Sequence, residues 1–148
     1  MDELNSAIGA ARAFGTDKRA DSILEPIQHQ LFTVGAEIAS QDPLKGPKIE
    51  NKHTMQLEDA TDIIMEGVGE TRSFLLPGGT QAGALLHVAR AVCRRAERSV
   101  AALAQEEAMR PELVMYLNRL STLLYALARK ANKGLEEKPP VYDLPAKH

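Results

Sequence analysis

Apolar residues recur along most of this chain at intervals of three and four positions, the period of an amphipathic α-helix. No segment alternates apolar and polar residues clearly enough to predict a strand. Turn and capping residues divide the chain into five helical segments. The predicted helices cover residues 2–13, 18–40, 54–69, a long segment that follows residues 74–79, and 111–133.

Two of these segments show the pattern most clearly. Apolar residues are spaced 4, 4, 3 and 4 apart in the second helix and 4, 3, 4, 3 and 4 apart in the fifth. This spacing places them on one side of a helix, where they pack against other helices. We therefore predict an all-α fold, an antiparallel five-helix bundle formed by a single domain over residues 1–148. The two apolar sides consist of Ile23, Ile27, Leu31, Val34 and Ile38, and of Leu113, Leu117, Leu120, Leu124, Leu127 and Ala131.

Several residues mark the helix ends and the connections. Asp17 and Thr80 can accept hydrogen bonds from the free amides of a first helical turn. Pro26 lies past the first turn of its helix, where we expect a local distortion. Residues 41–53 are rich in helix breakers and are predicted to form a polar linker. The Pro-rich tail at residues 134–148 either wraps a neighbouring subunit or is loose.

The fourth predicted helix carries four arginines and one glutamate between positions 90 and 98, a local charge of +3. Arg94 is four residues from both Arg90 and Arg98, and such like-charge pairs cost about 0.2–0.5 kcal/mol each. A bound polyanion would offset this cost, because guanidinium groups match the geometry of phosphate. The pattern thus indicates a phosphate ligand, with a merely solvated helix face as the alternative. At 100° per residue the apolar side holds Leu85, Ala89, Val92, Cys93, Ala96, Val100 and Leu103, and the opposite side holds Arg90, Arg94, Glu97 and Arg98.

The composition argues against several classes of protein. With 18 basic and 20 acidic residues, a net charge of −2, the chain lacks the positive charge typical of nucleic-acid or membrane binders. Its single cysteine, Cys93, cannot form an intrachain disulfide, which fits a reducing compartment. The sequence shows neither a secretory signal pattern nor an apolar stretch of membrane-spanning length. We therefore expect a cytoplasmic protein.

Residues that commonly bind metals do not form a recognisable site. Glu50 and His53 make the only Glu-x-x-His pair, and they lie in the predicted linker, so a di-iron centre is not predicted. There is no Cys-x-x-Cys motif for zinc, and Cys93 falls on the apolar side of its helix as a core residue rather than a nucleophile. The glycine pairs lack a dinucleotide fingerprint and a Walker lysine. We predict no metal site and no P-loop.

Four segments of the sequence resemble one family. They are D-E-L-N-S at residues 2–6, F-L-L-P-G-G-T-Q at 74–81, L-H-V-A-R-A-V-C-R-R-A-E-R at 86–98 and Y-L-N-R-L-S at 116–121. Over residues 2–133 the chain is similar to the PduO-type ATP:cob(I)alamin adenosyltransferases. The resemblance implies transfer of the 5′-deoxyadenosyl group from ATP, with Mg²⁺, to cob(I)alamin as substrate. It also implies a homotrimer with active sites at the subunit interfaces, and an adenosylcobalamin-dependent enzyme as a partner.

The resemblance further implies roles for eight residues. Phe74 is implied to lie against the lower face of the corrin and to help expel the axial ligand of cobalt. On composition alone, Phe74 is instead a loop hydrophobe packed into the end of the bundle. Asp2 is implied to pair with Arg90 across the subunit interface, and these two with Arg94 are the implied catalytic residues. The implied ATP ligands are Arg94, Arg95, Glu97, Arg98 and Asn118.

The sequence departs from the family pattern at two points. Thr122 stands where the family usually has an aspartate, so an ion pair at that position is in question. The family's T-R-x-G-D-x-G-like loop, which wraps the triphosphate and Mg²⁺, does not precede Asp2 here, and we hypothesise a start codon assigned too late or a truncated chain. Two alternatives to the enzyme stay open. One is a non-catalytic cobalamin- or nucleotide-binding paralogue, and the other is a structural helical oligomer whose arginine face meets an acidic partner.

Overall fold

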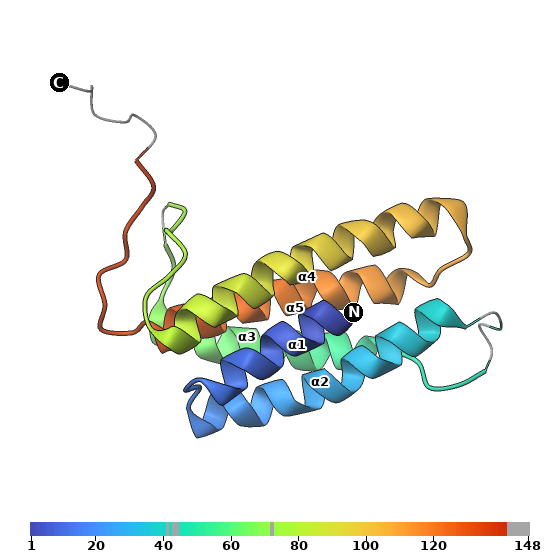
Figure 1. The fold of residues 1–148 in the computed structure, drawn as a ribbon, viewed down its shortest axis with the longest axis horizontal. Coiled ribbons are helices and arrows are strands. Elements are labelled where there is room, and N and C mark those ends of the chain that lie inside the picture. The colour runs from blue at the N-terminus through green and yellow to red at the C-terminus, as the bar shows by residue number, and fades with distance from the viewer. Residues whose placement is uncertain (41, 43–44, 72, 142–148) are drawn as a thin grey trace.

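The computed structural model describes residues 1–40, 42, 45–71 and 73–141, and every regular element in these ranges is an α-helix (Figure 1). The all-α prediction is confirmed. Pro43 of the predicted linker and residues 142–148 of the predicted tail lie outside the described residues. No helix in the described ranges is long and apolar enough to cross a membrane. The helices are α1 (Asp2–Ala13), α2 (Lys18–Ala39), α3 (Asn51–Val68), α4 (Gln81–Glu106) and α5 (Pro111–Ala131).

Consecutive helices run in opposite directions, so the bundle is antiparallel as predicted (Figure 1). α4 packs against α5 and α1, α3 packs against α5, and α1 packs against α2. α5 is the central helix, because its buried residues lie around most of its circumference rather than on one stripe. The five leucines predicted on its apolar side are all buried, whereas Ala131 is half-buried. α2 continues through Pro26 without ending there.

Side-chain caps explain where three helices begin. The two predicted N-caps are confirmed: Asp17 and Thr80 each accept a hydrogen bond from the backbone N–H three residues further on, at 2.7 and 3.0 Å. The hydrogen bond from the backbone N–H of Ala20 also lowers the pKa of the Asp17 carboxyl. α3 begins at Asn51, inside the predicted linker, because Glu50 and His53 form a capping box. In that box the backbone N–H of Glu50 donates to Nδ1 of His53 at 2.9 Å.

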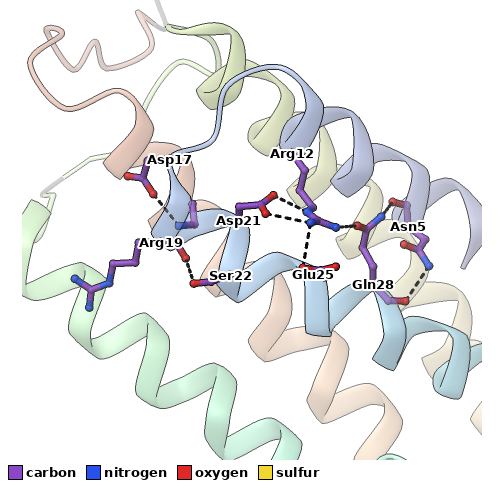
Figure 2. Close-up of polar contacts among 9 residues, drawn as sticks. Asn5, Arg12, Asp17, Arg19, Asp21, Ser22, Glu25 and Gln28 are labelled. Atoms are coloured by element: carbon purple, nitrogen blue, oxygen red, sulfur yellow. Dashed lines mark hydrogen bonds and ion pairs between the residues drawn. The ribbon is translucent and has the colours of Figure 1, made fainter.

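A polar network holds α1 against the first half of α2 (Figure 2). The Arg12 guanidinium donates to both carboxylate oxygens of Asp21, at 2.7 and 3.1 Å, and to Oε1 of Gln28 at 2.7 Å. Asn5 and Gln28 are joined twice, because the side-chain amide of each donates to the backbone carbonyl of the other. The hydrogen bond from Arg12 lowers the pKa of the Asp21 carboxyl. These contacts fix α1 along α2 and so determine where its N-terminal residues lie.

One buried arginine joins three parts of the chain. Arg129 of α5 is only 4% exposed, and its guanidinium donates to the backbone carbonyls of Val68, at 3.2 Å, and Gly69 at the end of α3. Its Nε also pairs with Glu137 of the C-terminal segment at 2.9 Å. Arg129 therefore ties the end of α3 and the start of the tail to the central helix.

We expect Arg129→Met to lower the free energy of unfolding by about 1–3 kcal/mol, because it removes the hydrogen bonds that a buried charged group makes to the end of α3 and to Glu137. Urea unfolding of the variant and the wild-type protein measures the change. Arg19→Met is the matched control, since Arg19 is an exposed arginine at the start of α2 and should change stability little. Equal losses in the two variants would show that the contacts of Arg129 are not what stabilises this end of the bundle.

Candidate functional site

A cavity of about 730 Å³ lies between α4, α5 and the loop that precedes α4. The loop supplies an apolar wall at Phe74 and Leu75, and α4 supplies cations at Arg90 and Arg94. An apolar surface and two guanidinium groups thus border one space, which we call the Phe74 cavity. Its other lining residues are Thr71, Ser73, His87, Ser121, Thr122 and Tyr125.

Phe74 lies at the mouth of this cavity and is 79% exposed. The chain reaches α4 through a Pro-Gly-Gly turn in which Gly78 and Gly79 have φ values of 141° and 104°, a region that glycine adopts without strain. This turn sets the path of the loop and leaves the ring in solvent. Covering a phenylalanine side chain with an apolar surface is worth about 1.5–3 kcal/mol, so the position suits a ligand with an apolar face.

The arginines of the cavity are not neutralised by the chain itself. Arg90 is half-buried, and its buried Nε has no hydrogen-bond partner among the described residues. Arg94 is exposed and forms no ion pair within the part of the chain that the structure describes, and the same holds for Arg98, which lies one turn further along α4 and does not line this cavity. Arg90 and Arg94 therefore present positive charge to the cavity, as the spacing on the helix predicted, and favour an anionic ligand.

Arg95 faces a different side of α4. It lines a second cavity of about 590 Å³ together with Asp2, and it forms an ion pair with Glu3 of α1. Asp2 itself has no ion pair in the described ranges, and it does not line the cavity of Arg90. Within one chain the structure thus separates Arg95 and Asp2 from the Phe74 cavity. The implied pairing of Asp2 with Arg90 stays a prediction about a neighbouring subunit.

A chain of hydrogen bonds joins Glu97 and Asn118, two of the implied ATP ligands. Nδ2 of Asn118 donates to Oε1 of Glu97 at 2.8 Å, and Oδ1 of Asn118 accepts from Arg119 at 2.6 Å. Arg119 also donates to Glu58 of α3 at 2.7 Å, so the chain crosses from α4 through α5 to α3. Asn118 is half-buried and held in one orientation rather than pointing freely into solvent. Thr122 lines the Phe74 cavity and donates weakly to the carbonyl of Asn118, at 3.4 Å.

His87 and Tyr125 line the cavity but were not predicted as site residues. Their rings meet edge to face with centroids 6.2 Å apart. The helical period contained a signal for both: His87 lies three and seven residues before Arg90 and Arg94, and Tyr125 lies seven residues after Asn118. Extending the predicted face of the fourth helix by one turn and that of the fifth by two turns would have included them.

His87 gives the protein a predictable response to acid. Burial, and secondarily the charge of Arg90, lower its pKa from the ordinary 6.5. The folded protein therefore keeps His87 neutral over a pH range in which the unfolded chain binds a proton. We predict that the free energy of unfolding falls as the pH drops below about 6.5, and that His87→Gln reduces this fall.

Denaturant unfolding near pH 7 and near pH 5.5 measures this effect for the wild-type protein and the variant. His29→Gln is the control, because His29 is exposed on α2, and it should keep the wild-type pH dependence. If His87→Gln loses as much stability on acidification as the wild-type protein does, the interpretation of His87 is wrong.

Cys93 lies in the core and is not available as a nucleophile, as predicted. Its side chain is fully buried and donates to the carbonyl of Leu117 at 3.2 Å. Burial, with a smaller contribution from Glu97, raises the pKa of the thiol to about 12. Within the described ranges, no group of three or more His, Cys, Asp or Glu side chains is arranged to hold a metal ion. What the cavity offers a ligand is an apolar wall and fixed positive charge.

The chain belongs to the cobalamin adenosyltransferase family, which matches residues 1–131. Corrinoid adenosyltransferase PduO of Salmonella typhimurium is 43% identical over 132 residues, covering 87% of this chain and 39% of the relative. The corrinoid adenosyltransferase of Mycobacterium leprae is 43% identical over 145 residues, covering 90% of this chain and 75% of the relative. The chain therefore spans well under half of the Salmonella protein and about three quarters of the mycobacterial one.

Solved structures of PduO-type enzymes are similar to this chain. A variant PduO-type ATP:corrinoid adenosyltransferase from Lactobacillus reuteri, complexed with cobalamin and ATP, has a TM-score of 0.83 and 35% identity, covering 95% of this chain and 81% of that one. A second variant, complexed with ATP, has a TM-score of 0.84 and 34% identity, covering 96% and 82%. The five-helix bundle is thus shared over nearly the whole chain.

Proposed function

We propose that this protein transfers the 5′-deoxyadenosyl group of ATP to cob(I)alamin, giving adenosylcobalamin and triphosphate. The observation that carries the proposal is the make-up of the Phe74 cavity. An exposed phenyl ring and the guanidinium groups of Arg90 and Arg94 border one space, so a flat apolar ring system and a polyphosphate can bind side by side. The family membership of the chain and the cobalamin and ATP bound by its structural neighbour support the same pair of ligands.

In this reaction the electron pair of Co(I) attacks C5′ of ATP. The C5′–O bond breaks, triphosphate leaves with the bonding electrons, and the new cobalt–carbon bond makes cobalt formally Co(III). The nucleophile is the substrate's cobalt, so the protein needs no activated side chain, and the buried thiol of Cys93 fits that requirement. The work left to the chain is to position the two substrates and to stabilise negative charge on the leaving group.

Each implied site residue has a place in this proposal. Arg94 and Arg98 would neutralise the triphosphate, with ATP entering as its Mg²⁺ complex, and Phe74 would cover the lower face of the corrin and exclude water. Asn118 would bind ATP, with Glu97 holding its side chain in orientation at 2.8 Å. Arg95 lies on the other side of α4, so it would reach ATP only where a subunit interface brings the nucleotide to that side.

We further propose that the active protein is a homotrimer in which Asp2 of one subunit pairs with Arg90 of the next. Two observations support this pairing: Arg90 forms no ion pair among the described residues, and Asp2 is exposed at the N-terminus of α1. Sedimentation equilibrium should give three times the mass of the chain. Asp2→Ala should weaken the trimer or lower its turnover, whereas a monomer of full activity would contradict the proposal. The adenosylcobalamin formed would pass to an enzyme that depends on it.

The products test the proposed reaction. The protein is incubated anaerobically with MgATP and chemically reduced cobalamin, and phosphorus NMR follows the fate of the phosphates. We expect one triphosphate for each adenosylcobalamin formed. Formation of ADP, or of pyrophosphate with AMP, would indicate a different reaction. Binding of both substrates without any product would instead favour a non-catalytic paralogue.

A further inference from the structure

The loop that carries Phe74 is joined to the end of α5 chiefly by the side chain of Asn132, and the hydroxyl of Thr80 also lies 3.3 Å from the carbonyl oxygen of Ala131. Oδ1 of Asn132 accepts hydrogen bonds from the backbone N–H and the hydroxyl of Thr80, at 2.9 and 3.0 Å. Nδ2 of Asn132 donates to the backbone carbonyl of Gly78 at 2.7 Å. One carboxamide therefore holds both sides of the Pro-Gly-Gly turn, although it lies more than 50 residues further along the chain.

Two glycines, which have no side chain, provide the space that the Asn132 side chain occupies. A Cβ atom at Gly83 would lie 2.0 Å from Oδ1 of Asn132, and one at Gly79 would lie 2.4 Å from it. Gly79 has a positive φ and would resist replacement for that reason alone. Gly83 is different, because it lies in the first turn of α4 with a helical backbone that any residue can adopt. The close approach of Asn132 is therefore a direct structural reason for a glycine at position 83.

Little else fixes this loop. In the part of the chain that the structure describes, residues 73–79 form two hydrogen bonds to the rest of the protein. One is the bond from Asn132 to Gly78, and the other runs from the N–H of Leu76 to the carbonyl of Lys138 in the C-terminal segment, at 2.8 Å. Phe74 cannot anchor the loop through packing, because it is 79% exposed. The position of its ring thus depends on the turn that Asn132 holds.

We propose that Asn132 is a positioning residue for corrinoid binding: it holds the turn that places Phe74 opposite Arg90 and Arg94. The inference rests on the proposed function, because it assigns the Phe74 loop to the corrinoid and the arginines to ATP. Asn132 does not line the Phe74 cavity, so it acts through the loop and not by contact with substrate. Its loss should therefore impair use of cob(I)alamin much more than use of ATP.

Steady-state kinetics of three variants test this inference. Asn132→Ala removes the hydrogen bonds, Gly83→Ala displaces the Asn132 side chain, and the third variant combines both changes. We expect each single variant to lower kcat/KM for cob(I)alamin at least tenfold while the KM for ATP stays within twofold of wild type. The double variant should be no worse than Asn132→Ala, because the added methyl group then has space. Gly67→Ala is the control, since a Cβ at this helical glycine of α3 meets nothing within 4 Å.

Three kinetic results would overturn the inference: unchanged kcat/KM in the single variants, parallel losses for both substrates, or additive losses in the double variant. Hydrogen–deuterium exchange of the ligand-free protein separates its failure from that of the proposed function. Asn132→Ala should speed exchange at residues 74–80 and leave α1 and α2 unchanged; unaltered exchange there would contradict the role of Asn132. If the wild-type protein shows no turnover, the proposed function is wrong, and so is the assignment of the Phe74 loop to the corrinoid. The exchange result still decides whether Asn132 holds the loop.

Discussion

Arg94→Ala is expected to lower kcat by about 10²–10³-fold, the loss typical of removing one group that stabilises charge in a transition state. Arg94 presents an exposed guanidinium to the Phe74 cavity, where triphosphate leaves in the proposed reaction. It forms no ion pair in the described ranges that would neutralise its charge. ATP binding should weaken as well. The proposed trimer and the free energy of unfolding should stay unchanged, because the side chain lies outside the core. Anaerobic initial rates over a range of ATP concentrations measure both effects.

Arg94→Lys is the matched variant for this prediction. Lysine keeps the positive charge but loses the planar pair of donors that binds two phosphate oxygens, so its rate should lie between those of wild type and Arg94→Ala. Arg19→Ala is the control, because Arg19 is an exposed arginine at the start of α2 that does not line the cavity, and this variant should keep the wild-type rate. A wild-type rate for Arg94→Ala would remove this residue from the site.

Phe74→Ala is expected to lower kcat/KM for cob(I)alamin about 10- to 100-fold. Burying a phenylalanine side chain is worth about 1.5–3 kcal/mol, and each 1.4 kcal/mol corresponds to a factor of ten. The folded protein gains little from this side chain, which is 79% exposed, so the stability of the variant should match wild type. The KM for ATP should also change little. Steady-state kinetics with each substrate varied in turn separate these effects.

Leu76→Ala is the control for Phe74. Leu76 lies in the same loop and is 54% exposed, but it does not line the Phe74 cavity, so its variant should keep nearly wild-type kinetics. Phe74→Leu keeps apolar bulk without a flat ring and should lose less activity than Phe74→Ala. Equal losses in Leu76→Ala and Phe74→Ala would mean that the loop, and not the ring of Phe74, matters for the reaction.

Most of the fold could be predicted because the apolar residues repeat with the helical period over long segments. The spacing alone predicts five leucines of α5 in the core, and all five are buried there. The start of α3 was wrong because His53 completes the capping box with Glu50, a role usually taken by Glu or Gln. The helix breakers in residues 41–53 predict a linker over the whole segment. They do not indicate that a helix begins at Asn51, before the segment ends.

The site was only partly predictable, and helix geometry explains which of its residues share a cavity and which do not. Arg90 and Arg94 are one turn apart and line one cavity, whereas Arg95, one residue further on, is rotated by 100° and faces Glu3. The family resemblance groups these arginines by motif and does not separate the two sides of α4. The contact of Asn132 with Thr80 could not be predicted, because no local pattern links residues 52 positions apart. Such contacts follow from how α5 lies beside the start of α4.

Transfer of a labelled adenosyl group is the decisive test of the proposed reaction. ATP labelled in its adenosine group is mixed anaerobically with cob(I)alamin and a catalytic amount of the wild-type protein, and the corrinoid is then separated in the dark. We expect one labelled deoxyadenosyl group on each corrinoid converted, released again by light because the cobalt–carbon bond is photolabile. An unlabelled corrinoid, recovered at saturating concentrations of both substrates, would contradict the proposed reaction.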